Sequence, residues 1–478
     1  MDQSQRVTLI EPLAVINGRE AIFLRDNFGG EVPLSCPYPP LELLYTASLL
    51  RQAQVPVELI AANVLGMRHE AVVARLRQNP PAWILIPSAW GSLPDDFRLM
   101  RLLKDAMPGT RLVISGPNVT VEPERPLRDS CADVVILGEP EEAMVGLACG
   151  QPPARLPNIA YLDGGMVVVG ERRLPAGWPD YPLPARDLVD LSRYVIPFSS
   201  RLPSTTMATV RGCPKKCTFC PTQIWNQRTV RARPIDRVME EINELVGRYG
   251  IREVAIRDDT FTWDRDRVLA FCEAMLHSGR ARDLTWRCFA TVDTVDAELL
   301  NLMARAGCVQ VCYGFESADD AVLQKCGKAT TVAQGYEAVR LTKAAGIEVS
   351  GTFIVGLEGD TPVTIRKSIE FAKSNDLDYL QVNVAVPLPT TGFGKRQERA
   401  GRHSRPDVFR WFGEQTGETA EIGKDDLPAY ARRFYREFYL RPTYIAGRLT
   451  SRRGARALWS HVKLGVRMAR HVLPALAK

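Results

Sequence analysis

The sequence predicts an α/β protein with two domains of parallel β-sheet, joined by a linker and followed by a helical region. Short apolar strands alternate with helices five times within residues 1–150 and six times within residues 201–394. This alternation is typical of parallel sheets that helices cover. The first sheet is therefore expected to be doubly wound, and the second to form a partial (β/α)6 barrel. Residues 151–200 are rich in Pro and Gly, which predicts a linker, and residues 395–478 predict mostly helix.

Composition favours a globular protein. Hydrophobic residues make up 45% and charged residues 24% of the 478 residues. The sequence contains no run of 18 apolar residues and begins without an apolar signal core, so we expect a cytoplasmic protein without a spanning helix. The net charge of +6 is uneven, since residues 427–478 carry 12 Lys and Arg against one Glu, or +11, and the rest carries −5.

The first domain is predicted to have the flavodoxin-like, doubly wound architecture. Its expected strands are residues 7–10, 57–60, 83–86, 112–114 and 134–137. Its expected helices are residues 41–52, 70–77, 95–106 and a segment that begins at Glu139. Ligands of such sheets bind beyond the carboxyl ends of the strands. Ser88, Gly116 and Gly138 stand at these ends and are therefore candidate cofactor contacts.

The second domain repeats the pattern with six strands. These are residues 206–210, 253–256, 284–289, 309–313, 349–354 and 379–386. The helices between them are residues 235–249, 265–277, 299–306, 332–345 and 364–373. Active groups of such barrels gather at the carboxyl ends of the strands. Polar or small residues stand there, namely Asp258, Asp259, Glu316 and Gly356.

Three cysteines follow the first barrel strand. Cys213, Cys217 and Cys220 have the spacing Cys-x3-Cys-x2-Cys, in a loop opened by Gly212 and Pro214. Thiolates at this spacing can hold one soft metal centre. A structural zinc or a fully ligated iron–sulfur cluster normally has four protein ligands. Three cysteines therefore indicate a cluster with one open iron, or else a zinc site with a distant fourth ligand.

The Gly-Cys-Pro opening and Phe219, just before the last cysteine, give the loop a resemblance to the cluster motif of the radical S-adenosylmethionine (SAM) enzymes. The resemblance implies that Cys213, Cys217 and Cys220 hold a 4Fe–4S cluster whose open iron chelates SAM. It also implies a small-molecule substrate and an electron donor of the flavodoxin or ferredoxin type.

The resemblance further implies roles for residues at the strand ends. Asp258 and Asp259 occupy the segment near the methionyl amino group, although the common Gly-Gly-Glu is replaced here. Glu316 lies in a Gly-Phe-Glu-Ser segment that is expected beside SAM. Gly356 ends a strand expected to flank the adenine, and Phe219 is expected to pack against the adenine. Singly, such acids and glycines are more often helix caps and turns.

The first domain resembles the cobalamin-binding domain attached to many radical SAM enzymes. The likeness lies in residues 114–120 and 135–139. The chain lacks the Asp-x-His-x-x-Gly loop whose histidine ligates cobalt in other cobalamin domains, and His69 does not fit that loop. Cobalamin is therefore expected to bind without a protein histidine on cobalt. The alternative is an empty domain kept for architecture.

These resemblances imply an enzyme that cleaves SAM and functionalises an unactivated carbon. The leading expectation is cobalamin-dependent C-methylation of a small-molecule or lipid-like metabolite. One alternative is cyclisation, rearrangement or aminocarboxypropyl transfer by an enzyme with a non-functional cobalamin domain. Another is a zinc-stabilised nucleic-acid-binding protein that uses the basic C-terminal tail. The tail has few interleaved aromatic residues, so no nucleic-acid partner is expected.

The C-terminal region predicts one further helix, over residues 455–473. Its apolar residues fall on one side and its basic residues on the other. Such a helix could lie in an anionic membrane interface, which would suit a lipid-like substrate. The alternative is that its apolar face packs on the barrel while the basic face stays in solvent.

Overall fold

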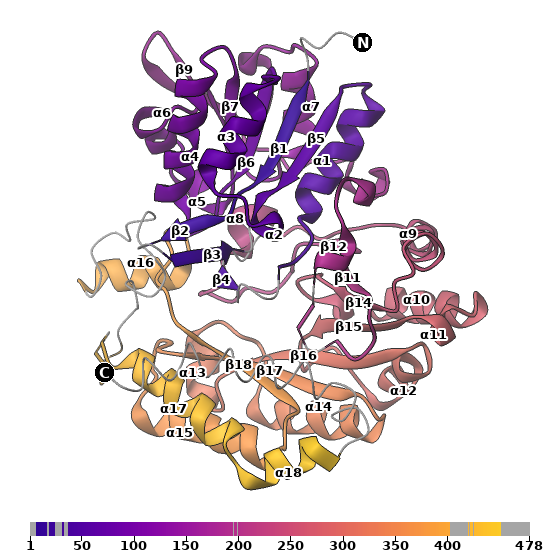
Figure 1. Ribbon diagram of the computed structural model, residues 1–478. Helices are drawn as coiled ribbons and strands as arrows, with labels where there is room; N and C mark the ends of the chain where they lie inside the picture. Colours follow the sequence, from indigo (N-terminus) through magenta and orange to yellow (C-terminus); the bar gives the residue numbers. More distant parts are fainter. Residues whose placement is uncertain are drawn as a thin grey trace.

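The computed structural model consists of two sheet domains stacked one above the other (Figure 1). It describes residues 6–16, 19–23, 31–32, 37–194, 196–197, 199–401, 419, 421–423 and 425–450. A seven-stranded sheet forms the first domain and a six-stranded sheet forms the second. Two small sheets, of two and three strands, lie in addition to these.

The first sheet has the strand order β10-β9-β8-β7-β6-β1-β5. Its strands are β1 (Val7–Glu11), β5 (Val57–Ala61), β6 (Trp83–Pro87), β7 (Arg111–Ser115), β8 (Val134–Ile136), β9 (Ile159–Asp163) and β10 (Met166–Val169). The five strands from β8 to β5 are parallel, and in chain order they give the flavodoxin-like sequence 2-1-3-4-5. The predicted doubly wound sheet is confirmed.

Helices cover both faces of this sheet because alternate strand residues are apolar on each face. Leu9 and Leu85 belong to one buried cluster, with residues of α1 (Leu41–Gln52) and α7 (Glu141–Ala148). Ile10 and Ile86 belong to another. That second cluster includes residues of α2 (Ala62–Leu65), α3 (His69–Arg77), α4 (Leu93–Ala106), α5 (Pro117–Val121) and α6 (Glu124–Asp129).

Two segments of the first domain contain strands that the sequence analysis did not predict. The hairpin of β9 and β10 lies within the expected linker and extends the first sheet antiparallel to β8. It does so because Ile159 and Ala160 are apolar and fully buried beside β8. A small sheet of β2 (Ala14–Ile16), β3 (Arg19–Phe23) and β4 (Glu31–Val32) lies at the end of the domain that faces the barrel (Figure 1).

The second domain is the expected partial barrel, with six parallel strands in chain order. They are β11 (Ser204–Met207), β14 (Glu253–Ile256), β15 (Thr285–Ala290), β16 (Cys308–Glu316), β17 (Glu348–Val355) and β18 (Tyr379–Val384). The main outer helices are α9 (Ile235–Gly247), α10 (Arg265–His277), α12 (Ala297–Arg305), α14 (Val332–Ala344), α15 (Pro362–Ser374) and α17 (Leu427–Tyr439). Shorter elements are α11 (Arg280–Asp283), α13 (Asp320–Lys325), α16 (Gly392–Arg399) and α18 (Pro442–Thr450).

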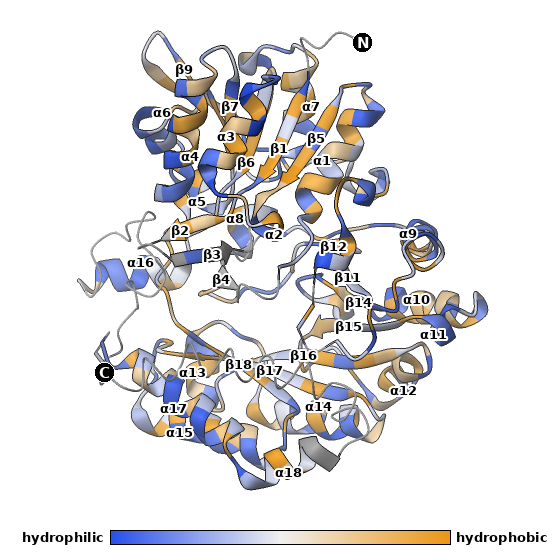
Figure 2. Ribbon diagram, in the orientation of Figure 1, coloured by the Kyte–Doolittle hydropathy of each residue, from blue (hydrophilic) through white to orange (hydrophobic). Residues whose placement is uncertain are grey.

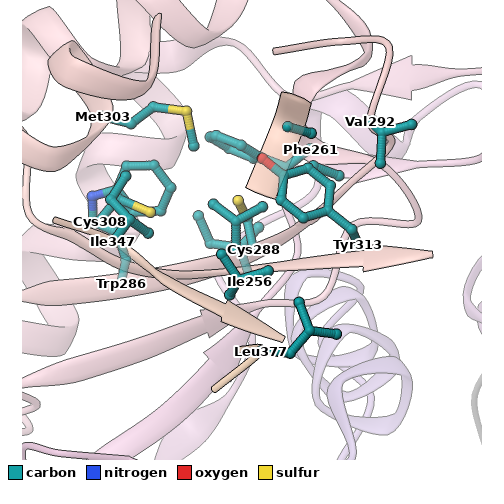
Figure 3. Packing of buried hydrophobic residues seen from close by; sticks show 14 of the residues in the cluster. Ile256, Phe261, Trp286, Cys288, Val292, Met303, Cys308, Tyr313, Ile347 and Leu377 are labelled. Atoms are coloured by element: carbon teal, nitrogen blue, oxygen red, sulfur yellow. The ribbon is translucent and has the colours of Figure 1, made fainter. Parts of the chain in front are cut away.

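The barrel core lies between the strands and the outer helices. Figure 3 shows Trp286, Cys288 and Tyr313 from the strands packed with Met303 from α12. The strand residues that alternate with this core face the other side of the sheet, where the register places Gly314 next to Thr352 and Thr352 next to Gln381. In Figure 2 the buried strands are mostly hydrophobic, while the outer helices carry many hydrophilic residues. The apolar layer of the barrel thus lies between the strands and the helices, while Thr352 and Gln381 lie on the opposite face of the sheet.

The two domains share part of one core. The short helix α8 (Thr222–Asn226) follows the cysteine loop, and its Ile224 is buried in the first domain's cluster together with Leu388, which follows β18. No helix in the described part of the chain is long and apolar enough to cross a bilayer. The amphipathic helix expected over residues 455–473 lies outside the described residues, and its contact with a membrane stays a prediction.

Glu241 of α9 holds two arginines in a fully buried ion cluster near the domain boundary. Its carboxylate is 2.6 Å from Arg186 Nη2, is paired with Arg233, and accepts a hydrogen bond from the Tyr45 hydroxyl. Burial opposes the charge of Glu241, but Arg186 and Arg233 together hold the pKa of Glu241 below its usual value. Removing the carboxylate charge would leave two buried cations without their partner.

We expect Glu241→Gln to reduce the free energy of unfolding by roughly 3 kcal/mol or more, since a buried pair is broken on one side only. The matched control is Glu240→Gln on the same helix, because Glu240 is half exposed and pairs with Arg237 at the surface. Glu240→Gln should reduce the free energy of unfolding by no more than about 1 kcal/mol. Urea unfolding followed by circular dichroism measures both. Equal losses in the two variants would contradict a special role for the buried cluster.

Candidate active site

The cysteine loop begins at a small hairpin. Strand β12 (Val210–Arg211) pairs with β13 (Arg231–Ala232), and Gly212 directly follows β12. Gly212 has φ of +99°, and a Cβ at this position would lie 2.0 Å from the Thr229 carbonyl oxygen. Only glycine fits this close approach of the two chain segments. The glycine that opens the motif is therefore required by the hairpin that starts the loop.

Thr218 fixes the middle of the loop to the barrel. Its N–H donates to the Cys326 carbonyl at 2.8 Å, and its carbonyl accepts from the Phe393 N–H at 2.9 Å. Its hydroxyl accepts from Arg396 Nη2 at 2.9 Å, while Arg396 is paired with Glu358. The direct contacts come from the end of α13 and from α16, and Glu358 in the segment after β17 holds Arg396. Two separate parts of the second domain therefore anchor the loop, and a third supports one of them.

The three cysteines of the loop are free thiols and partly buried. Cys220 donates to the Thr222 hydroxyl at 3.2 Å, and Cys213 Sγ lies 3.5 Å from Thr260 Oγ1. Burial raises the pKa of Cys217 and raises that of Cys220 to about 12. Iron would have to displace these protons, because thiolates are the metal ligands. Three neighbouring soft donors on one anchored loop fit a cluster held by three cysteines.

A single-ion site has a different geometry. Within the described ranges, no three side chains of His, Cys, Asp or Glu are grouped as one metal ion would need. Cysteines that bind three different irons of a cluster do not have to converge on one point.

Glu316 lies beside the cysteine loop, at the carboxyl end of β16. The strand has a register shift there, and Glu316 has a positive φ of 65°. Its carboxylate is 3.0 Å from Lys328 Nζ, and Lys328 also donates to the Gly314 carbonyl. Both side chains are almost fully buried. A left-handed backbone at a non-glycine residue stores strain of about 1–3 kcal/mol, and such strain clusters at functional sites.

Asp258 is hydrogen-bonded to the segment that leads into the cysteine loop. Its carboxylate is fully buried and accepts hydrogen bonds from the Thr209 N–H at 2.6 Å, the Val210 N–H at 2.9 Å and the Thr209 hydroxyl. These bonds use both carboxylate oxygens to hold the segment that leads into the cysteine loop. Asp258 therefore has a positioning role in this segment, and its contact with SAM stays a prediction. Asp259 lies closer to the loop and accepts from the Gly212 N–H at 3.2 Å.

Gly356 and Phe219 both lie near the end of β17. Gly356 has φ of +90°, and a Cβ there would lie 2.6 Å from Leu427 at the start of α17. Phe219 packs on a small apolar cluster that includes Leu357 and Phe393. The glycine is thus required by helix packing, and the aromatic ring lies beside the end of the strand that was expected to flank the adenine. The contacts of both residues with SAM stay predictions.

The sequence analysis missed several residues of this site. No sequence motif indicated Lys328, Arg396 or Thr218, because each of them acts through a partner that is far away in the sequence. Ser317 follows Glu316, and its buried hydroxyl has no hydrogen-bond partner among the described residues. Arg257 directly precedes Asp258, and its guanidinium lies 5.2 Å from the Tyr38 ring and 5.7 Å from the Phe289 ring. Arg257 stands in the same strand-end segment as Asp258 and Asp259, so its position could have been noted from the sequence, whereas its aromatic neighbours could not.

The first domain has its own strand-end site, at the switch point between β1 and β6. Ser88 donates to Asp96 at 2.7 Å and accepts from Asn118 at 3.0 Å, so its hydroxyl is used within the protein. A Cβ on Gly116 would lie 2.1 Å from the Ser88 carbonyl oxygen. Ser88 and Gly116 therefore build the floor of the site. Gly138 has open space, since the nearest atom to an added Cβ is on Arg172 at 3.5 Å.

This strand-end site retains unused donors that suit a polar cofactor. Trp90 Nε1 and Ser115 Oγ are buried and have no hydrogen-bond partner in the part of the chain that the structure describes. Trp90 follows β6, and Ser115 is the last residue of β7. His69 is buried and its Nε2 lies 2.9 Å from Asp95, which also accepts from the Val15 N–H. The free donors of Trp90 and Ser115 fit a cofactor rich in amide groups. The imidazole ring of His69 is instead bound to Asp95 within the protein.

Buried ion pairs join the two strand-end sites. Arg211, two residues before Cys213, pairs with Glu139 at 2.7 Å and also with Glu141. Its guanidinium lies 3.8 Å from the centre of the Trp178 ring. Arg231 also pairs with Glu139. Burial opposes the charge of Glu139, yet Arg211 and Arg231 keep the pKa of Glu139 below its usual value. The loop after Gly138 is thus tied to the start of the cysteine loop.

The fold and the two sites define a radical SAM enzyme that carries a cobalamin-binding domain. Residues 207–372 match the Radical SAM superfamily and residues 34–148 match the B12 binding domain. These two matches assign the chain a 4Fe–4S cluster, SAM and cobalamin as its cofactors. They exclude the zinc-stabilised nucleic-acid-binding alternative.

The chain is similar to several known proteins over most of its length. It is 28% identical to an uncharacterized methyltransferase of Pyrococcus horikoshii, over 85% of this chain and 89% of that protein. It is 27% identical to the anaerobic magnesium-protoporphyrin IX monomethyl ester cyclase of Cereibacter sphaeroides, over 77% and 62%. The cobalamin-dependent S-adenosylmethionine radical enzyme OxsB has the same fold, with a TM-score of 0.74 and 18% identity over 98% of this chain and 72% of that one.

We expect replacement of Cys213, Cys217 and Cys220 by Ala to abolish cluster binding and SAM cleavage. The exposed thiol of Cys149 offers a control, and Cys149→Ala should keep the full iron content. Iron and sulfide analysis and the visible absorbance of anaerobically reconstituted protein measure the difference. A triple variant that still holds a complete cluster would show that these cysteines are not the ligands.

Asp258 should give the stability of the metal-free protein a distinct pH dependence. Burial raises its pKa to about 6. A raised pKa means that the folded state binds the proton more tightly, so this stabilisation is full below about pH 4 and is lost as pH rises through about 6. The stability of the wild type relative to Asp258→Asn should therefore fall by up to a few kcal/mol between these pH values. Urea unfolding measures it, with the exposed Asp105→Asn as control; a pH-independent difference would contradict it.

Proposed function

We propose that this enzyme transfers a methyl group to an unactivated carbon of a small-molecule metabolite. The observation that carries the proposal is the Arg211–Glu139 pair, which joins the loop after Gly138 to the start of the cysteine loop. A cobalamin at the first domain and a cluster at the second would then face one shared space. When bound, the cluster and SAM supply a carbon radical by hydrogen abstraction, and cobalamin supplies the methyl group.

The chain's own residues bind, orient and exclude water. Cys213, Cys217 and Cys220 are proposed to hold the cluster. Asp259 and Glu316 lie beside that loop, where they suit the amino and ribose groups of SAM. The substrate is proposed to occupy the barrel interior. There Gln381 and Asn383 are exposed, and Gln381 Nε2 donates to Asn383 Oδ1 at 3.1 Å.

Electron delivery is proposed to come from a small flavodoxin-type or ferredoxin-type protein. The cysteine loop reaches solvent at Pro214 and Lys216, which are both exposed. A positive side chain at that point suits an acidic electron carrier.

A second candidate function is cyclisation or rearrangement of the substrate radical. It is favoured by the similarity to the cyclase of Cereibacter sphaeroides, over 77% of this chain. Aminocarboxypropyl transfer by an enzyme with an empty first domain remains a third candidate. The candidates differ in the fate of the SAM methyl group, which an isotope label can follow.

Methylation predicts transfer of the label from SAM that carries a trideuterated methyl group. Cobalamin-reconstituted enzyme, a chemical reductant and a metabolite extract should yield a labelled small molecule three mass units heavier than its unlabelled counterpart. The cysteine triple variant provides the background. A product that gains the aminocarboxypropyl group, or that changes without the label, would exclude methylation.

Gly138 offers a direct test of the cobalamin site. Gly138→Val should lower bound corrinoid at least about tenfold, because the side chain would enter the open space at this strand end, while the iron content stays unchanged. Gly150→Val is the matched control, since Gly150 has the same φ of +82° but no neighbouring atom within 4 Å of an added Cβ. Corrinoid absorbance after desalting measures binding. If wild-type protein never retains corrinoid, the first domain is architectural; equal retention by the two variants would place the cofactor elsewhere.

A further inference from the structure

A buried lysine outside the cysteine motif lies against the cluster loop. Lys328 is 8% exposed and follows a turn that packs directly on this loop. Within that turn, the Cys326 carbonyl accepts from the Thr218 N–H at 2.8 Å. A Cβ on Gly327, which has φ of +66°, would lie 3.0 Å from the Lys216 carbonyl oxygen. The turn therefore has a fixed position relative to Cys217.

The ammonium group is held in place by two acceptors. Nζ lies 3.0 Å from Glu316 Oε1 and also donates to the Gly314 carbonyl. Burial lowers the pKa of Lys328, but the nearby charges of Glu316 and of the Cys217 and Cys220 sulfurs raise it overall. Lys328 is therefore a charged group that faces both the carboxylate and the cysteine loop.

The turn before Lys328 contacts the cluster loop on both sides of Cys217. It bonds the Thr218 N–H and packs on the Lys216 carbonyl, and these two residues are the neighbours of Cys217. Removal of the ammonium would leave the charge of Glu316 without its cation beside this ligand. Because the two groups are buried, solvent and salt screen their charges far less than they would at the surface.

We propose that Lys328 makes the cluster easier to reduce, by placing a buried positive charge beside Cys217. Reduction adds one electron, and therefore one negative charge, to the cluster and its three thiolates. A nearby cation stabilises the more negative state and raises the reduction potential. The electron comes from an external reductant, and no bond in the protein forms or breaks. The inference requires the cluster but does not depend on which reaction the enzyme performs.

The cluster loop itself offers a matched control. Lys215 stands between Cys213 and Cys217, but its ammonium pairs with Asp293, and the two side chains are 26% and 21% exposed. Solvent reaches this pair, so removal of its charge should have a small effect on the cluster. The comparison separates the buried charge of Lys328, beside the cluster loop, from the partly exposed charge of the same sign on the loop itself.

The test is a redox titration of cluster-loaded, SAM-free protein with dithionite and mediators, followed by electron paramagnetic resonance. Lys328→Met should lower the ratio of reduced to oxidised cluster about tenfold at fixed potential, which equals about 59 mV for one electron. Lys328→Arg should restore the ratio to within about twofold of the wild type, and Lys215→Met should change it less than about twofold. A Lys328→Met shift no larger than that of Lys215→Met, or an upward shift, would overturn the proposal.

A second variant covers a possible failure of Lys328→Met to fold, since that change leaves Glu316 buried without its cation. Lys328→Met combined with Glu316→Gln removes both charges and leaves no unpaired carboxylate. The double variant is compared with Glu316→Gln alone, which keeps the cation, and its potential should be lower because the only difference is the loss of the positive charge. A potential equal to or above that of Glu316→Gln would overturn the proposal. A purely structural lysine would reduce iron loading without altering the potential of the loaded fraction.

Discussion

The contact on which both cofactor sites depend is the buried pairing of Arg211 with Glu139 and Glu141. Removing three charges from water is costly, and the cost is offset only when the geometry is good and the remaining donors are bonded. Here the guanidinium bonds two carboxylates and lies on the face of Trp178. Since Gly212 follows immediately, the direction in which the cysteine loop leaves its hairpin depends on this arginine.

Charge pairs surround the loop on other sides as well. Arg396 and Glu358 hold Thr218, and Lys328 with Glu316 lies beside Cys217. Each pair combines a charge with a hydrogen bond to the loop or to the strand end beneath it. Three cysteines separated by small intervals have no preferred arrangement of their own. Their arrangement is imposed from outside the motif, by residues that lie up to about 180 positions away in the chain.

The sequence predicted the elements well where burial is periodic. Helix α1 has the predicted bounds, Leu41–Gln52, and five of the six barrel strands lie where the apolar runs indicated. The first barrel strand, β11 (Ser204–Met207), shares only residues 206 and 207 with the expected strand over 206–210. The hairpin β9–β10 was missed because Pro and Gly flank it, although Ile159 and Ala160 are fully buried. Local composition describes the ends of such a hairpin and says nothing of the sheet that it joins.

The site was predictable only where the signal is local. The cysteine spacing needs no tertiary information, whereas the environment of Asp258 is set by Thr209 and Val210, almost 50 residues earlier. An aspartate at a strand end can face a ligand or the neighbouring backbone, and only the packing decides. Lys328 and Arg396 gave no signal for the same reason, since each acts through residues that are distant in sequence.

The burial of Ile224 within the first domain has a consequence for how this chain can be divided. A barrel expressed by itself would expose Ile224, Leu388 and the charges of Arg211 and Arg231, all of which now lie in the contact between the domains. The barrel is therefore not a portable catalytic module to which a cobalamin carrier has been appended. The two halves form a single fold whose division would cut through its own interior.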